Sequence, residues 1–153
     1  MAECHGLLSS SQEGFRPYKN TIRQLQMALN AIEDAKSHDQ NIYALWVDFS
    51  SAFNTIDHDK LLQIMYDLGF PDGAINAVKG IYSHSQMRVI TPHGRTAPIP
   101  IERGTIQGDT LSPFLFLVFL EPLLRWLQSG GRGYEFGCLD GHTRQVHRCG
   151  ASA

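Results

Sequence analysis

A carboxylate stands at the end of a strongly apolar run in this sequence. Residues 43–47 read YALWV, Asp48 follows at once, and the chain turns hydrophobic again at Phe49. A charged group at the end of a buried strand is costly unless it is paired or bound to a cation. Two interpretations stay open: Asp48 caps a backbone group or pairs with an arginine, or it is an oxygen ligand for a hard cation such as magnesium. Two such metals, held by a few carboxylates, can stabilise both oxygens of a phosphoryl transfer.

A second stretch combines glycines, a glutamine and a helix start. It reads RGTIQGDTLSP and covers residues 103–113. One interpretation is a turn into a helix, with Ser112 as its cap and Pro113 at its first position. That interpretation leaves Gln107, Gly108 and the earlier glycine unexplained. Glycines let a backbone approach a ligand closely, a glutamine can hydrogen-bond a base or sugar, and a helix N-terminus favours anions, so ligand contact by this stretch is a second interpretation.

Regular apolar spacing predicts the helices that would position these residues. From Asn20 or Thr21, either of which is a suitable N-cap, apolar residues recur at steps of three and four. Asp57 is the expected cap of a second helix. The apolar residues of these two helices are Ile22, Leu25, Leu29 and Ile32, and Leu61, Leu62, Met65 and Leu68. A short helix is expected over residues 72–82 and a long apolar one over residues 112–128.

Extended segments alternate with these helices. The nearly continuous apolar run over residues 41–49 predicts a strand with both faces covered. Two β-rich runs at residues 86–91 and 96–101, joined by the turn-like PHGR, predict a hairpin. Residues 134–153 resemble a second hairpin with Asp-Gly at its turn. This mixed order favours an α+β fold, with helices on one face of a sheet.

Composition sets limits on the class of protein. The chain has 153 residues, of which 42% are hydrophobic and 18% charged, enough for a folded core. Its net charge of −2 excludes an overall basic field, although a local basic face is possible. Three cysteines make no disulfide framework, which fits a reducing compartment. The apolar run over residues 114–120 is too short to span a bilayer, so no membrane partner is expected.

Three motifs together resemble a known family. GFRPYKNT, WVDFSSAFNTIDHDKLL and RGTIQGDTLSPFLFLVFLEPLLR occur in the order and at the spacing of reverse transcriptases, in their non-long-terminal-repeat retrotransposon and group II intron branch. The resemblance covers about residues 14–125. It implies a partial polymerase right-hand fold, the palm with part of the fingers, whose antiparallel sheet is backed by helices. We therefore expect one partial domain over residues 1–153, with its fingers and palm core at 14–130 and the second hairpin at 131–153.

The resemblance also implies roles for single residues near the first motifs. Asp48 falls on the first metal-binding aspartate of the palm, and the backbone carbonyl of Phe49 would reach a metal as well. The complete enzyme would use two Mg²⁺ ions. Phe53 falls on the bulky residue that blocks a ribose 2′-OH, so deoxynucleotides would be selected. These assignments imply nucleotidyl transfer.

Further residues fall on the substrate path of the family. Gln107 and Gly108 lie on the loop that runs along the incoming nucleotide. Arg16, in the fingers, and Arg103 are expected to contact nucleic acid. The partners implied are an RNA template, a DNA primer and deoxynucleoside triphosphates. The remaining fingers, palm and thumb would belong to a longer parent chain, located inside the cell in the nucleus or the cytoplasm.

Two departures from the family pattern affect the expected activity. Asn54 stands where the family usually has an aspartate, which we expect to have a modest effect. The aromatic-x-Asp-Asp turn that supplies the other catalytic carboxylate is expected after the second hairpin, and the sequence has no Asp-Asp pair. The chain as given should therefore be a fragment, inactive by itself.

Other functions remain possible from the residues alone. A decayed or domesticated retroelement copy could be a non-catalytic domain that binds nucleic acid or protein. A ribonuclease H-type nuclease also sets an aspartate at a strand end, but gives the glycine loop no role. A zinc site would draw on Cys138, His142, His147 and Cys149, whose spacing matches no usual finger.

Overall fold

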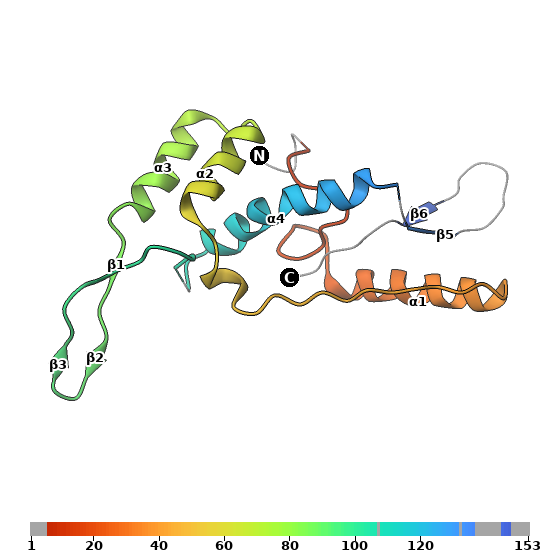
Figure 1. Ribbon diagram of the computed structural model, residues 1–153, viewed down its shortest axis with the longest axis horizontal. Coiled ribbons are helices and arrows are strands. Elements are labelled where there is room, and N and C mark those ends of the chain that lie inside the picture. The colour runs from red at the N-terminus through yellow and green to blue at the C-terminus, as the bar shows by residue number, and fades with distance from the viewer. Residues whose placement is uncertain (1–5, 107, 132, 137–144, 148–153) are drawn as a thin grey trace. The chain divides into compact units, whose positions relative to one another are not determined.

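The computed structural model describes residues 6–106, 108–131, 133–136 and 145–147, and Figure 1 shows its helices and strands. The chain forms two compact units: unit 1 contains residues 1–48 and 120–153, and unit 2 contains residues 49–119. The helices are α1 (Thr21–Ser37), the 3₁₀ turn η1 (Ala52–Asn54), α2 (His58–Asp67), α3 (Asp72–Tyr82) and α4 (Leu111–Ser129). The strands are β1 (Gln86–Met87), β2 (Ile90–Thr91), β3 (Gly94–Arg95), β4 (Ile99–Pro100), β5 (Tyr134–Phe136) and β6 (Gln145–His147).

Helix α1 belongs to unit 1 and begins where its cap predicts. The Asn20 side chain accepts a hydrogen bond from the Arg23 amide, which confirms Asn20 as the N-cap. Ala31 and Ala35 are the buried residues of this helix. Its larger apolar residues Ile22, Leu25 and Leu29 are exposed instead. The helix therefore packs through a narrow strip of small side chains.

A buried glutamate joins the N-terminal segment to the second half of α4, also within unit 1. Glu121 is fully buried, and its Oε2 accepts a hydrogen bond from the Ser9 amide at 2.9 Å. Its Oε1 accepts from Arg125 Nε at 2.8 Å, and Arg125 also donates to the Leu7 carbonyl. Gln128 donates to the Ser9 hydroxyl. These bonds compensate the burial of the carboxylate and hold residues 7–9 against the helix.

The strand predicted over residues 41–49 is not present. The segment has no regular structure, and no strand among the described residues pairs with it. Tyr43, Leu45 and Trp46 are exposed, Tyr43 to 93%. The prediction of a covered strand was wrong because an apolar run marks a segment that can pair, whereas a strand forms only where a neighbour supplies its backbone hydrogen bonds.

Unit 2 is built on the helix pair α2 and α3, which pack against each other. As predicted, Asp57 caps α2, with its carboxylate accepting from the Lys60 amide at 3.1 Å. The prediction of a helix over residues 72–82 is confirmed as α3. The buried apolar side chains of unit 2 are Ile56, Leu61, Met65, Val78, Tyr82, Leu115, Phe116, Leu117 and Val118.

Helix α4 starts earlier than predicted and is capped differently. Leu111 is its first residue, and the Leu111 amide donates to Asp109 Oδ1 at 3.1 Å. Ser112 was predicted as the cap, but its hydroxyl donates back to the Ile106 carbonyl. By length and composition α4 could cross a membrane, although the apolar run over residues 114–120 was predicted to be too short for this; Leu115, Leu117 and Val118 are buried in the fold.

The strands form three separate antiparallel pairs in the described residues. β1 pairs with β4 and β2 with β3, which confirms the predicted hairpin, but Gly94 and Arg95, predicted to lie in its turn, form β3. β5 pairs with β6, so the second hairpin is confirmed as well. Its expected Asp-Gly turn, like Cys138, His142 and Cys149, lies outside the described residues. The fold is α+β, with two-stranded ribbons in place of the single sheet expected.

Candidate active site

Within unit 2, the segment after Asp48 is hydrogen-bonded to the glycine loop. The Gly104 amide donates to the Ile56 carbonyl at 2.7 Å, and the Thr105 amide donates to the Phe53 carbonyl at 2.8 Å. One β-bridge joins Asp57 to Arg103 beside them. Two motifs separated by about fifty residues in the sequence therefore lie against each other through backbone bonds.

Gly104 allows this close approach. Its φ is +85°, in the region that favours glycine, and a Cβ there would lie 2.8 Å from the Asn54 Cα and 3.0 Å from the Phe53 carbonyl oxygen. Those atoms are backbone and have little room to move. The first glycine of RGTIQGDTLSP is thus explained by packing against residues 53–54, whereas the sequence suggested ligand contact.

The other end of the loop is fixed to the start of α4. The Ile106 carbonyl accepts from the Ser112 hydroxyl at 2.7 Å and from the Asp109 amide at 3.2 Å. Gly108 is exposed, with φ +89° and open space where a Cβ would stand. Gln107 lies outside the described residues. The loop is therefore anchored on both sides of an exposed position that was predicted to meet a nucleotide.

Phe53, the predicted sugar-discriminating residue, has a fixed neighbour. It lies in η1 and is half-buried, and its ring centroid is 5.0 Å from that of Phe116 on α4 at an interplanar angle of 43°. Such tilted aromatic pairs are favourable beyond the area they bury. The packing restrains the Phe53 ring, which a steric role requires.

Asp48 and Phe49 provide oxygen atoms, but not a complete metal site. Asp48 is the last residue of unit 1 and its side chain is exposed, so no burial cost calls for a cation there. Across the described ranges, no group of three or more His, Cys, Asp or Glu side chains could hold a metal ion. One carboxylate and one carbonyl fall short of the near-octahedral oxygen shell that Mg²⁺ takes. The metal role of Asp48 therefore rests on family resemblance.

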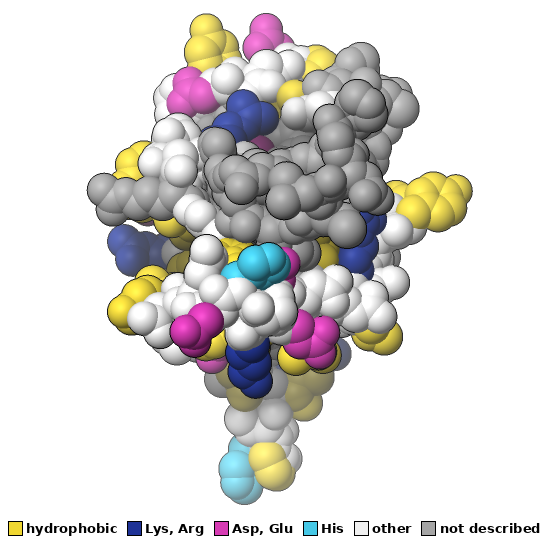
Figure 2. All heavy atoms as spheres, turned by 90° about the vertical axis from the view of Figure 1, so that its right-hand side faces the viewer, with side chains coloured by type: hydrophobic (Ala, Val, Ile, Leu, Met, Phe, Trp, Pro, Cys, Tyr) yellow, Lys and Arg dark blue, Asp and Glu magenta, His cyan; other side chains and the backbone are white. Residues whose placement is uncertain are grey.

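The two predicted nucleic-acid contacts differ in their surroundings. Arg16, in unit 1, donates to the carbonyls of Ser9 and Gln12 and so holds its own loop. Arg103 is exposed in unit 2, beside Asp57. Figure 2 shows one face of the molecule, on which the described basic and acidic side chains are interspersed. No broad basic surface stands out among the described side chains of that face.

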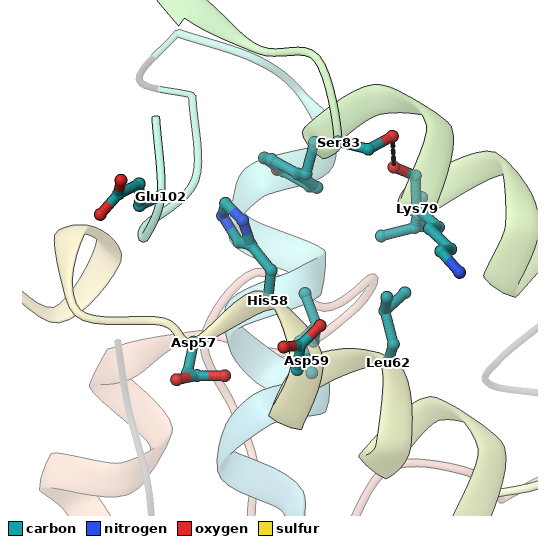
Figure 3. A pocket seen from close by; sticks show the side chains of 10 residues that line it. Asp57, His58, Asp59, Leu62, Lys79, Ser83 and Glu102 are labelled. Carbon is teal, nitrogen blue, oxygen red and sulfur yellow. Dashed lines mark hydrogen bonds between the residues drawn. The ribbon is translucent and has the colours of Figure 1, made fainter. Parts of the chain in front are cut away.

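A cavity of about 240 Å³ opens in unit 2, where residues of α2 and α3 lie near Glu102. Figure 3 shows His58 pointing into it from the start of α2, with Glu102 on one side and Ser83 on the other. His58 Nε2 lies 2.7 Å from the Gly104 carbonyl oxygen. Burial raises the pKa of the Tyr82 hydroxyl, so Tyr82 is neutral under ordinary conditions. The cavity is lined by Asp57, His58, Asp59, Leu61, Leu62, Val78, Lys79, Tyr82, Ser83 and Glu102.

The contact of His58 with the loop was missed by sequence reasoning. The histidine stands between Asp57 and Asp59 in the first turn of a helix. Carboxylates are favourable at that end of the helix dipole, which accounts for Asp57 and Asp59 but assigns no role to His58. Nothing in the sequence names its partner.

Comparison with known proteins identifies the family to which this chain belongs. Residues 1–136 match the family model of the reverse transcriptase, or RNA-dependent DNA polymerase, and the chain belongs to this family. The predicted resemblance to reverse transcriptases of non-long-terminal-repeat retrotransposons is confirmed.

Its relatives include two polyproteins of retrotransposable elements and a polymerase of a transposon. The chain is 31% identical over 123 residues to the retrovirus-related Pol polyprotein from type-1 retrotransposable element R2 of Popillia japonica, covering 80% of this chain and 17% of the relative. It is 27% identical over 123 residues to the R2 polyprotein of Nasonia vitripennis, covering 80% of this chain and 12% of the relative. It is 26% identical over 117 residues to the probable RNA-directed DNA polymerase from transposon BS of Drosophila melanogaster, covering 76% and 13%. The chain thus spans less than a fifth of each of these relatives.

Proposed function

We propose that this chain is part of the palm and fingers of a retroelement RNA-directed DNA polymerase. In this function an RNA template directs the extension of a DNA primer by deoxynucleoside triphosphates. Family membership supports the proposal. The observation that carries it is the backbone pairing of Phe53 and Ile56 with Thr105 and Gly104, because it unites the two motifs that a polymerase needs at one nucleotide.

Asp48 and the Phe49 carbonyl would be part of a site for two Mg²⁺ ions. When bound, such ions stabilise the charge that develops on the attacking and leaving oxygens of nucleotidyl transfer. The contribution of this chain would be one carboxylate, Asp48, which precedes in the sequence the segment whose Phe53 and Ile56 carbonyls pair with the loop. Further carboxylates are required, so the 153 residues alone should not extend a primer.

Phe53, Gln107 and Gly108 would contact the nucleotide. Phe53, restrained by Phe116, would occupy the space that a 2′-OH needs and so favour deoxynucleotides. The exposed Gly108 would let the loop backbone lie close to the nucleotide. Arg16 and Arg103 would contact the phosphates of template and primer, where a guanidinium is well suited to bind.

A chimera tests this proposal. The matching 123-residue segment of the Popillia japonica relative is replaced by that of this chain, and primer extension is measured with deoxynucleotides and ribonucleotides. Phe53→Ala should lower the preference for deoxynucleotides at least about tenfold, because a steric exclusion is lost. Phe70→Ala removes another aromatic contact of α4, to Phe114, and should leave the preference unchanged. An unaltered sugar preference in Phe53→Ala would remove Phe53 from the nucleotide site.

A decayed or domesticated binding domain is the second candidate. It rests on the sequence, which has no Asp-Asp pair to supply the further carboxylates that nucleotidyl transfer requires. The same chimera distinguishes the two. Template binding without any incorporation of nucleotides would support the binding domain and contradict the polymerase.

A further inference from the structure

A histidine outside the predicted site contacts the glycine loop. His58 Nε2 lies 2.7 Å from the carbonyl oxygen of Gly104, 46 residues further along the chain and within the same unit. A carbonyl oxygen can only accept, so Nε2 carries the hydrogen and donates it. The His58 ring enters the cavity from the first turn of α2 (Figure 3).

This bond and a second one hold the same peptide group. The carbonyl of the Gly104–Thr105 peptide accepts from His58, and the N–H of that peptide donates to the Phe53 carbonyl at 2.8 Å. The two bonds act on opposite edges of one peptide plane. A rotation of the plane would break both, so together they fix its orientation more firmly than either bond alone.

The His58 ring is itself held in place. Its centroid lies 4.6 Å from that of the Tyr82 ring, at an interplanar angle of 31°. Tyr82 is only 5% exposed and belongs to α3, so it gives the ring a rigid neighbour. The cap at Asp57 fixes the backbone immediately before His58. The donor is therefore oriented by residues of both α2 and α3.

We propose that His58 is a positioning residue, which fixes the Gly104–Thr105 peptide and thereby the start of the loop that leads to Gly108. The inference rests on the proposed function for its consequence, since that loop is the part expected to meet the nucleotide. The claim that His58 fixes the Gly104–Thr105 peptide, here called the geometric part, concerns the described residues alone. The claim about the nucleotide is tested by a different measurement.

Amide hydrogen exchange in the 153-residue chain tests the geometric part. His58→Phe keeps a ring beside Tyr82 but has no donor, His58→Gln restores a donor, and His84→Phe changes an exposed histidine of the same unit. Exchange at Thr105 should be roughly 2- to 10-fold faster in His58→Phe, as expected from the loss of one hydrogen bond. It should be close to wild type in His58→Gln and in His84→Phe.

The tautomer of the wild-type imidazole provides a readout that needs no variant. Nitrogen-15 spectra of the histidines should show His58 protonated at Nε2. A neutral His58 with its hydrogen on Nδ1 overturns the proposal. Unchanged Thr105 exchange in His58→Phe overturns it too, and equally fast exchange in His58→Gln would assign the effect to ring packing.

The consequence for the nucleotide is measured in the chimera. His58→Phe should raise the KM for deoxynucleotides roughly 2- to 10-fold with a smaller change in kcat, and His58→Gln should restore it. An unchanged KM in His58→Phe, with normal activity otherwise, overturns the positioning role. A wild-type chimera without any activity contradicts the proposed function instead, and the exchange result is independent of that outcome.

Discussion

Gly104→Ala tests whether the loop is packed as closely on residues 53–54 as the structure shows. Gly104 has φ +85°, and an added Cβ would lie 2.8 Å from the Asn54 Cα. Gly108 is a matched control because its φ, +89°, is nearly the same, but no atom lies within 4 Å of its added Cβ. Comparing the two alanine variants separates backbone strain from steric overlap.

The expected losses of unfolding free energy follow from backbone strain and steric overlap. An alanine in the left-handed region costs about 1–2 kcal/mol, and this applies to both positions. The overlap at Gly104 is with backbone atoms of η1, so the loop must shift and weaken its bonds to Phe53 and Ile56. Overpacking of this kind adds about 1–3 kcal/mol. Gly104→Ala should therefore lose about 2–5 kcal/mol of unfolding free energy and Gly108→Ala about 1–2 kcal/mol.

Urea unfolding of the 153-residue chain, followed by circular dichroism, measures both losses. The slope of free energy against urea should be the same in the two variants, so that the midpoints compare directly. Equal losses in Gly104→Ala and Gly108→Ala would refute the close approach. The loop would then be placed differently from the structure, and its pairing with residues 53–56 would no longer support a shared nucleotide site.

Two further predictions concern stability. Glu121→Gln should lower the unfolding free energy by about 1–3 kcal/mol, because Glu121 is fully buried and accepts a charge-assisted bond from Arg125. The exposed Glu33→Gln should change it by less than about 0.5 kcal/mol, and equal effects would contradict the anchoring role of Glu121. The Lys60 amide lowers the pKa of Asp57 below its usual value, so the cap stabilises the fold above about pH 4 and is lost as pH falls through the lowered pKa. Asp57→Asn should therefore show a flatter decline of the urea midpoint between about pH 5 and pH 2, and a decline equal to that of wild type would contradict the cap.

The helices could be predicted from the sequence because their signals are local. Asn20 and Asp57 mark the starts of α1 and α2 through bonds that reach only three residues along the chain. The spacing of apolar residues shows that α1 is a helix, but not which side is covered. The buried side is formed by Ala31 and Ala35, since only contacts from elsewhere in the chain decide where a helix packs.

The features that the sequence did not predict depend on contacts between residues far apart in the sequence. The run that ends at Asp48 has strand-forming residues, yet strand formation depends on a neighbour that the run itself does not specify. The contact of His58 with Gly104 joins positions 46 residues apart, and the sequence contains no pattern that links them. The resemblance to the family predicted that the glycine loop lies at the site, whereas the reason for Gly104 is evident only from the atoms beside it.

Asp48→Asn in the chimera tests the central claim most directly, because it changes one oxygen of the predicted metal ligand and little else. Primer extension should fall to background, whereas Asp39→Asn, at another exposed aspartate of unit 1, should leave it unchanged. Near-normal extension by the Asp48→Asn chimera would contradict the account, since the polymerase would then work without the carboxylate on which the proposed site is built.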